Sequence, residues 1–221
     1  MSIYNNKKTL FFKIKNKSLK EWKKYTNHPF VIKLGNGTLP LSCFKIYLLQ
    51  DYIFLQKLIK ILCLSAYKAN TTLDRDRSLK FIMGIKHELN LHIKYCRKFN
   101  IPKSKILATK ERTQNRTYTD YVLNIGTKKS NLELFIALSP CIIGYGEIGY
   151  NLSKIKNWKK NKYSSWIKMY SSKEYQSIAT KNIRYLDELF TNNNKNSYKS
   201  LVKIFKKASL LEANFWEMCL S

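Results

Sequence analysis

One thiol and two carboxyl groups are the side chains of this sequence best suited to do chemistry. Cys141 follows a proline in "SPC". In the first turn of a helix, a cysteine lies beside unpaired N–H groups that lower its pKa and favour the nucleophilic thiolate. Asp51 and Glu212 fall at helical spacing from apolar residues, so both carboxyl groups should face the core, where an unpaired charge is costly. Singly, each acid could belong to a buried ion pair and the cysteine could be inert; together they predict a thiol-dependent site.

The motif "GYGEIG", from Gly144 to Gly149, has the G-x-G-x-x-G spacing of a dinucleotide-binding loop. That fingerprint requires a preceding strand, a following helix and an acidic residue about 20 positions later. Here the preceding run, "NLELFIALSP", has helical spacing and ends in proline. We therefore interpret the motif as part of a helix that begins at Pro140, in which Tyr145 shares a face with Cys141. Its glycines predict close helix packing or room for a ligand.

The segment "HELNLH" contains two histidines, His87 and His92, which are five residues apart and diverge on a helix. This spacing is not H-E-x-x-H, and we expect no metal site there. Glu88 and His92 are four residues apart, which predicts an inward polar pair with a supporting role. The 5 cysteines are widely spaced without a C-x-x-C motif, which is typical of reduced thiols rather than of a disulfide framework.

Most of the chain repeats its apolar residues at the helical period, and it has only 7 Gly and 4 Pro. We therefore predict an all-α fold in a single domain over residues 1–221. Ser42 should cap a long helix that reaches Ala66, and a second should run from Asp74 to Phe99. "TNNNKN" predicts a loop. The remaining predicted helices are Thr117–Ile125, Leu132–Leu138, Pro140–Leu152, Ser164–Tyr170, Lys173–Phe190 and Ser197–Cys219.

The net charge of +27 suggests a nucleic-acid partner at first sight. Only six of the 41 basic residues are Arg, however, and the lysines are spread over the whole chain. This favours a generally basic, solvated surface over a nucleic-acid footprint. We find no apolar run of about 20 residues and no signal peptide at the N-terminus, so we expect a cytoplasmic protein without a membrane partner.

A set of short motifs, in order from about Trp22 to Met218, resembles the TenA family in its thiaminase II or aminopyrimidine aminohydrolase group. The motifs are "HPFVIKLGNGTLP", "FKIYLLQDYIFL", "HELNLH", "YTDYV", "ALSPCIIGYGEIG", "YSSWIKMY" and "EANFWEM". The resemblance implies a heme-oxygenase-like helical bundle, a homotetramer and no metal or organic cofactor. Because Cys141 is present, the chain is similar to the cysteine-bearing branch of the family.

The resemblance also implies a role for each matching residue. Cys141 would be the nucleophile, Glu212 the acid/base residue, and Asp51 the ligand of the amino group and ring nitrogen of a pyrimidine. Tyr118, Tyr145, Tyr170 and Phe54 would line the pocket. The implied reaction is hydrolysis of the C–N bond at the exocyclic methylene of an aminopyrimidine. The substrate would be a breakdown product of thiamin such as aminomethyl-aminopyrimidine, with thiamin itself poorer, and the product hydroxymethylpyrimidine would serve thiamin salvage.

Two positions depart from the family pattern. Phe54 stands where many relatives have Tyr, and Ile143 replaces a Trp that is common after the P-C of the family. Two other hypotheses remain open from the sequence: a non-catalytic basic helical protein that binds polyanions or RNA, and an oxidase on the heme-oxygenase-like fold. The lack of a well-placed ligand histidine disfavours haem.

Overall fold

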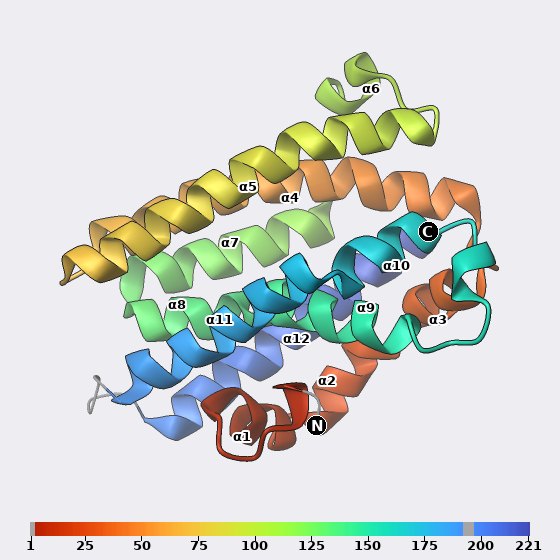
Figure 1. Cartoon of the computed structure of the whole chain (residues 1–221). Coiled ribbons are helices and arrows are strands. Elements are labelled where there is room, and N and C mark those ends of the chain that lie inside the picture. Colours follow the sequence, from red (N-terminus) through yellow and green to blue (C-terminus); the bar gives the residue numbers. More distant parts are fainter. Residues whose placement is uncertain (1–2, 192–196) are drawn as a thin grey trace. The chain divides into compact units, whose positions relative to one another are not determined.

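The computed structural model describes residues 3–191 and 197–221, and every regular element in these ranges is a helix (Figure 1). The all-α prediction is thereby confirmed for the described part of the chain. Of the predicted loop "TNNNKN", residues 192–196 lie outside it. The contacts of the chain divide into two compact units. Unit 1 is formed by Met1–Leu39 and Phe135–Glu217, and unit 2 by Pro40–Leu134 and Met218–Ser221.

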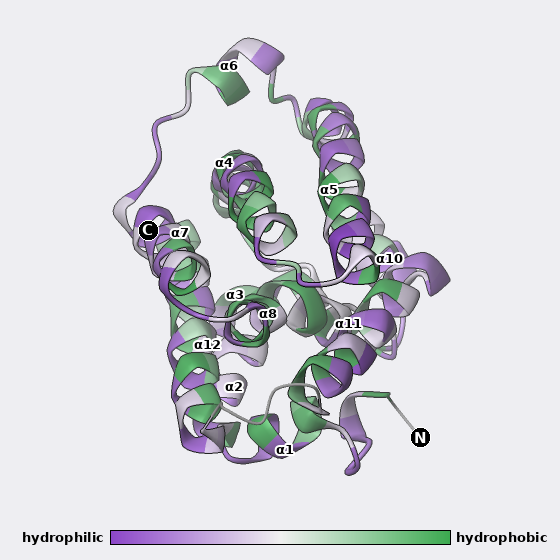
Figure 2. Ribbon diagram, turned by 90° about the vertical axis from the view of Figure 1, so that its left-hand side faces the viewer, coloured by the Kyte–Doolittle hydropathy of each residue, from purple (hydrophilic) through white to green (hydrophobic). Residues whose placement is uncertain are grey.

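Unit 2 is built on two long antiparallel helices, α4 (Leu41–Tyr67) and α5 (Thr72–Lys98), which lie side by side in Figure 1. α7 (Thr113–Lys128) also packs against α4. Figure 2 shows the short helix α6 (Lys103–Leu107) in an extended connection that leaves α5 and returns to α7. α4 is therefore the central helix of this unit, with partners along two of its faces.

Several large apolar side chains of α5 are exposed to solvent. Figure 2 shows hydrophobic and hydrophilic residues intermingled along it. Leu79, Met83 and Leu91 are all exposed, and Met83 retains 61% of its accessible surface. Leu79 and Leu91 retain 48% and 49% of their accessible surface.

Unit 1 contains the N-terminal helices and most of the C-terminal half of the chain. α1 packs against α2 and α11, while α10 packs against α9 and α11. The elements are η1 (Ile3–Asn5), α1 (Leu10–Asn16), α2 (Leu19–Thr26), α3 (Pro29–Asn36), the end of α8 (Asn131–Ser139), η2 (Pro140–Gly144), α9 (Tyr145–Leu152), η3 (Trp158–Lys160), α10 (Ser164–Ser171), α11 (Lys173–Thr191) and α12 (Tyr198–Leu220) as far as Glu217.

The N-terminal ends of α4 and α5 differ from the sequence predictions, because other residues than those expected precede their first turns. α4 begins at Leu41 after Pro40 rather than being capped by Ser42, because the proline can precede the first turn without an N–H to satisfy. α5 begins at Thr72, and the Thr71 side chain accepts a hydrogen bond from the Asp74 backbone N–H. The capping residue thus lies three positions before the predicted start of that helix.

The helical run from Asn131 to Leu152 is long and apolar enough to cross a membrane by length and composition. In its most apolar window of 18 residues, however, 83% of the residues are buried inside the protein. Burial of this kind is typical of a core helix, because a lipid-facing helix leaves its apolar side chains exposed.

Candidate active site

Cys141 lies inside a continuous helix rather than at its start. The prediction of a helix N-terminus at Pro140 is wrong, because Ser139 already has helical angles and α8 runs directly into the π-helical segment η2. The backbone N–H groups of a first turn are therefore not what surrounds this thiol. The proline is accommodated by a widened π-helical turn, a feature frequent at functional sites.

Three hydrogen bonds fix the backbone and the thiol in this widened turn. The Tyr25 hydroxyl on α2 donates to the Pro140 carbonyl at 3.1 Å, and the Tyr175 hydroxyl on α11 donates to the Ile142 carbonyl at 3.2 Å. The Cys141 Sγ itself donates to the Leu138 carbonyl at 3.0 Å. Cys141 is thus held from both flanks, and its thiol rests as a proton donor that must lose its proton before it can attack.

The glycines of "GYGEIG" serve close packing. A Cβ atom at Gly144 would lie 2.5 Å from the Tyr25 ring, and one at Gly149 would lie 2.5 Å from the Cβ of Tyr170 and 2.7 Å from its backbone carbon. Of the two alternatives left open by the sequence, the structure thus shows the first, since helices α2 and α10 occupy the space of the missing side chains. The hydroxyl of Tyr25 can reach the Pro140 carbonyl because Gly144 lets its ring approach.

An ion pair with Lys15 fixes Glu147, the acidic residue of this motif. Lys15 on α1 lies 3.2 Å from the Glu147 carboxylate and also donates to the Tyr4 carbonyl at 2.7 Å. Burial raises the pKa of Glu147, while the charge of Lys15 and hydrogen bonds from Lys15 and Trp22 act against that rise. In the sequence, the only indication of this ion pair was the position of an acidic residue, Glu147, in an otherwise apolar helix.

Glu212 on α12 is 2% exposed, as its spacing predicted. It lies one helical turn before Trp216, whose ring centroid is 5.3 Å from that of Tyr145. Tyr145 in turn lies 5.1 Å from Tyr170. These aromatic contacts connect α9, which follows Cys141 in the chain, to the helix that carries Glu212.

Asp51 is 6% exposed on α4, so the predicted core-facing carboxyl group is confirmed. Burial raises its pKa to about 7, although a hydrogen bond from the Tyr47 side chain acts in the opposite direction. Tyr47 was missed in the sequence, where its position one turn before Asp51 was the available signal. Burial also raises the pKa of Glu88 on α5 to about 8, with a further contribution from the negative charge of Asp51.

His92 contacts α4. Its Nδ1 lies 3.5 Å from the Asp51 Oδ2, and its Nε2 lies 2.8 Å from the Leu48 carbonyl oxygen. Burial lowers the pKa of His92, whereas the hydrogen bond with Leu48 raises it. His92 thus approaches Asp51 on α4, while its predicted pairing with Glu88 and its supporting role remain predictions.

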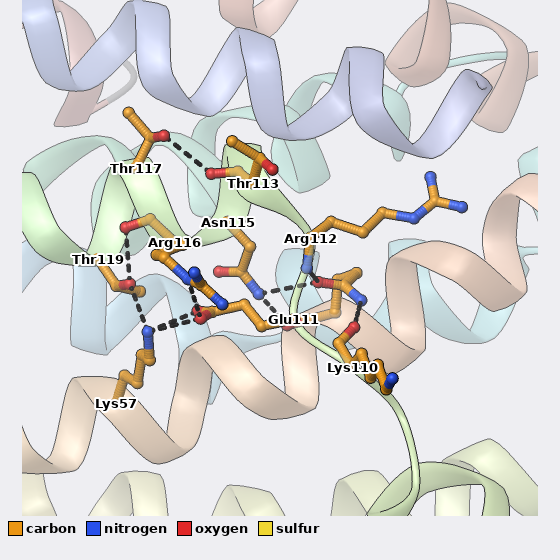
Figure 3. A network of polar contacts seen from close by, with 10 residues as sticks. Lys57, Lys110, Glu111, Arg112, Thr113, Asn115, Arg116, Thr117 and Thr119 are labelled. Carbon is orange, nitrogen blue, oxygen red and sulfur yellow. Dashed lines mark hydrogen bonds and ion pairs between the residues drawn. The ribbon is translucent and has the colours of Figure 1, made fainter.

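A polar network joins α4 to the start of α7 (Figure 3). The buried Gln50 donates to the Lys110 carbonyl at 2.9 Å and accepts from the Arg112 backbone N–H at 2.9 Å. Asn115 donates to the Gln50 carbonyl at 2.8 Å, and Lys57 pairs with Glu111 at 2.7 Å. These bonds fix the register of the two helices that carry the candidate pocket residues of unit 2.

Among those pocket residues, Phe54 and Tyr118 are both buried, with ring centroids 5.2 Å apart. The structure therefore divides the predicted site residues into two sets. Unit 1 contains Cys141, Tyr145, Tyr170 and Glu212, and unit 2 contains Asp51, Phe54, Glu88, His92 and Tyr118.

The other cysteines differ from Cys141 in their surroundings. Burial raises the pKa of the Cys96 thiol to about 12 and that of the Cys219 thiol further, so both remain protonated. Cys43 is buried as well, whereas Cys63 is exposed on α4. Within residues 3–191 and 197–221, no group of three His, Cys, Asp or Glu side chains is placed to hold a metal ion.

Fold and site together define a class of all-helical protein that combines a partly exposed thiol with buried carboxyl groups. A domain of unknown function from Shewanella denitrificans, described as having a heme oxygenase-like fold, superposes with a TM-score of 0.74 at 15% identity, covering 94% of this chain and 90% of that one. At this identity the likeness shows the fold alone, and it confirms the heme-oxygenase-like prediction.

The chain belongs to the TENA/THI-4/PQQC family, whose family model matches residues 16–221. It is 35% identical over 199 residues to an aminopyrimidine aminohydrolase from Helicobacter pylori, covering 89% of this chain and 92% of that protein. The crystal structure of a TenA family transcription regulator from Silicibacter sp. TM1040 has a TM-score of 0.89 at 32% identity, covering 96% of both chains. The predictions of TenA membership and of an enzyme are thereby confirmed.

Proposed function

We propose that this protein is a hydrolase of aminopyrimidines that contributes to thiamin salvage. Its reaction would cleave the C–N bond at the exocyclic methylene of aminomethyl-aminopyrimidine, and more weakly of thiamin, to give hydroxymethylpyrimidine. The similarity to the aminopyrimidine aminohydrolase of Helicobacter pylori over nearly the whole chain is the observation that carries this proposal. The partly exposed Cys141 and the buried Glu212 supply chemistry suited to such a reaction.

In this proposal Cys141 is the nucleophile. Its thiol gives up the proton that it now shares with the Leu138 carbonyl, and the thiolate adds to a carbon of the electron-poor ring. A carbon–sulfur bond forms, and the electron pair moves toward a ring nitrogen. The tyrosine hydroxyls that bind the Pro140 and Ile142 carbonyls support the role, because they hold the backbone on both sides of the thiol.

Glu212 acts as the acid and base of the same reaction. Its carboxyl group protonates the ring nitrogen during addition, and the exocyclic C–N bond then breaks with its electron pair leaving on the amine. Water adds at the methylene carbon, the carbon–sulfur bond breaks, and the thiol is restored. One water is consumed, and one amine and one alcohol are formed.

Substrate binding is assigned to the remaining predicted residues. Asp51 binds the amino group and ring nitrogen of the pyrimidine, and the aromatic side chains offer flat surface to the ring. Phe54 supplies such a surface without a hydroxyl group. The aromatic residues assigned this role are Phe54, Tyr118, Tyr145 and Tyr170.

The decisive test measures alcohol and amine release from aminomethyl-aminopyrimidine by the wild type and by Cys141→Ala. We expect the variant to lose more than about 100-fold in kcat, as for loss of a group that takes part in the chemical step. Cys63→Ala removes the exposed thiol on α4 and is the matched control, with activity expected to be unchanged. Full activity of Cys141→Ala would contradict the covalent mechanism, and an inactive wild type would contradict the proposed function.

We also propose that the enzyme is a cytoplasmic homotetramer, as the family resemblance implies. The exposed apolar stripe of α5, defined here by Leu79, Met83 and Leu91, supports self-association, because large exposed apolar side chains are often covered at protein interfaces. A second copy of the chain is the partner that we assign to this stripe.

A further inference from the structure

The position of His92 between two oxygen atoms determines which of its ring nitrogens carries a proton. The Nε2 lies 2.8 Å from the Leu48 carbonyl oxygen. A carbonyl oxygen can only accept a hydrogen bond, so the Nε2 must be the donor. In the neutral ring, the Nδ1 is then an acceptor, and it is this atom that lies 3.5 Å from the Asp51 Oδ2.

Two proton arrangements are compatible with this contact. His92 could be charged and face an ionised Asp51, or a neutral ring could face a protonated Asp51 whose O–H points toward the Nδ1. His92 is 8% exposed and Asp51 6% exposed, so the ion pair would require two charges to leave water at a cost of several kcal/mol. The neutral arrangement avoids this cost, keeps the hydrogen bond from Nε2 to the Leu48 carbonyl and leaves the Asp51 O–H free to turn toward the Nδ1 that lies 3.5 Å away.

The surrounding groups favour the neutral arrangement further. Glu88 on α5 faces Asp51 as a second carboxyl group, and two neighbouring carboxylates resist ionising together. Tyr47 on α4 donates a hydrogen bond to Asp51, and burial keeps the nearby thiols of Cys96 on α5 and Cys219 near the chain end protonated. The charged Arg112, which acts on Cys219, donates to the Met218 carbonyl. The directions of the pKa shifts of Asp51 and His92 agree with this arrangement.

We propose that His92 is a positioning residue that holds Asp51 as a neutral carboxylic acid for the recognition of an uncharged aminopyrimidine. In the resting protein the Asp51 O–H points to the Nδ1 of His92. A bound aminopyrimidine replaces that acceptor with its own ring nitrogen and donates its amino N–H to the other oxygen of Asp51. An ionised Asp51 could make this pair of bonds only to a protonated ring. The inference rests on the proposed binding role of Asp51.

The proton arrangement can be measured without any activity. The protein contains 3 histidines, so ¹⁵N-histidine labelling gives a simple spectrum in which the loss of one ring in His92→Gln identifies His92. We expect a neutral ring protonated at Nε2 between about pH 5.5 and 7.5, with an Nδ1 shift that changes near pH 7 as Asp51 ionises. In Asp51→Asn the tautomer should persist and the change near pH 7 should vanish. An imidazolium ring between about pH 5.5 and 7, or a proton on Nδ1 alone, would overturn the proposal.

The effect on catalysis separates the proposed role from a merely structural one. The amide of His92→Gln can still donate to Leu48 and accept from Asp51, so we expect its KM within about threefold of wild type. His92→Leu can do neither, and its KM should rise about three- to tenfold, the usual effect of one lost hydrogen bond, with kcat almost unchanged. The high-pH limb of kcat/KM should move to lower pH, because the acid form of Asp51 has lost its acceptor.

The exposed His87 on the same helix gives the matched control, His87→Leu, for which no change is expected. Wild-type KM and an unshifted pH profile in His92→Leu would contradict the proposal. If His92→Leu does not fold, the KM of His92→Gln and the ¹⁵N-histidine spectrum of the wild type still test the proposal. A wild type that hydrolyses no aminopyrimidine would instead contradict the proposed function, while the spectrum would remain a test of the His92 tautomer.

Discussion

At the scale of single residues, Glu212 has a buried carboxyl group to which we assign the acid/base role. Glu212 is buried on α12, one helical turn before Trp216, whose ring contacts Tyr145. Glu212→Gln keeps the shape and removes the exchangeable acid, so we expect kcat to fall by about 10²- to 10⁴-fold with an unchanged melting temperature. Steady-state kinetics and thermal unfolding measure the two effects.

The control for this substitution is Glu217→Gln on the same helix, where the carboxylate is 71% exposed. It should retain wild-type kcat. An active Glu212→Gln, or an equal loss in both variants, would contradict the acid/base role.

The buried carboxyl groups of unit 2 also make stability depend on pH. Asp51 and Glu88 keep their protons to about pH 7 and about pH 8 in the folded protein, against ordinary pKa values of 3.8 and 4.5. Between these limits the folded state binds more protons than the unfolded state, so the free energy of unfolding should fall as pH rises from about 4 to about 8. The lowered pKa of His92 acts in the opposite direction below about pH 6.5.

Urea unfolding at a series of pH values measures this dependence. Asp51→Asn should remove the part of the decline that ends near pH 7, and Glu88→Gln the part that ends near pH 8. A decline of the same size in both variants and the wild type would show that other groups are responsible.

At the scale of elements, the packing of α10 against α9 depends on the absence of one side chain. A methyl group at Gly149 would lie within 2.7 Å of the Tyr170 Cβ and backbone carbon, neither of which can swing aside. Gly149→Ala should therefore cost about 1–3 kcal/mol of unfolding free energy and lower activity through Tyr170.

Gly84→Ala is the comparison, because a Cβ there meets nothing within 4 Å and Ala favours helix by up to about 1 kcal/mol. Denaturant unfolding of both variants checks the pair. A stable Gly149→Ala would contradict the packing argument, and a destabilised Gly84→Ala would indicate that a second copy covers α5.

The sequence predicted the long helices well, because their apolar residues repeat over many turns. It also predicted the burial of Asp51 and Glu212, since a lone acid on an apolar face stands out in such a repeat. It failed at Pro140, where proline is equally at home in a first turn and at the widened turn that the structure contains. The hydrogen bonds from Tyr25 and Tyr175 that hold this turn join residues more than 30 positions apart, and no local pattern encodes them.

The N-terminal helices were not predicted either. α1 to α3 are each 7 or 8 residues long, too short for a helical period to be distinctive. Lys15 and Glu147 are 132 positions apart, so their pairing became visible only in the folded protein.

At the scale of the whole molecule, the exposed stripe on α5 makes a prediction about assembly. Met83→Glu places a charge in that stripe and should shift the protein from tetramer to smaller species, which sedimentation velocity detects. Met169→Glu on α10 substitutes another exposed methionine, 39% accessible, and should leave the assembly intact. A tetrameric Met83→Glu would show that α5 is not an interface.

The division of the chain into two units has a consequence for folding during synthesis, because unit 1 is formed by two segments that are far apart in the sequence. Unit 1 combines the first 39 residues with Phe135–Glu217. The ring of Phe30 stacks on Trp216 at 4.7 Å, and that of Trp22 stacks on Phe205 at 5.2 Å. At a synthesis rate of about 5–20 residues per second, roughly 10 to 40 s pass between the synthesis of Trp22 and Phe30 and that of their partners Phe205 and Trp216. During that interval the nascent chain lacks the partners that bury these side chains in the folded protein, and apolar surface exposed in this way favours aggregation.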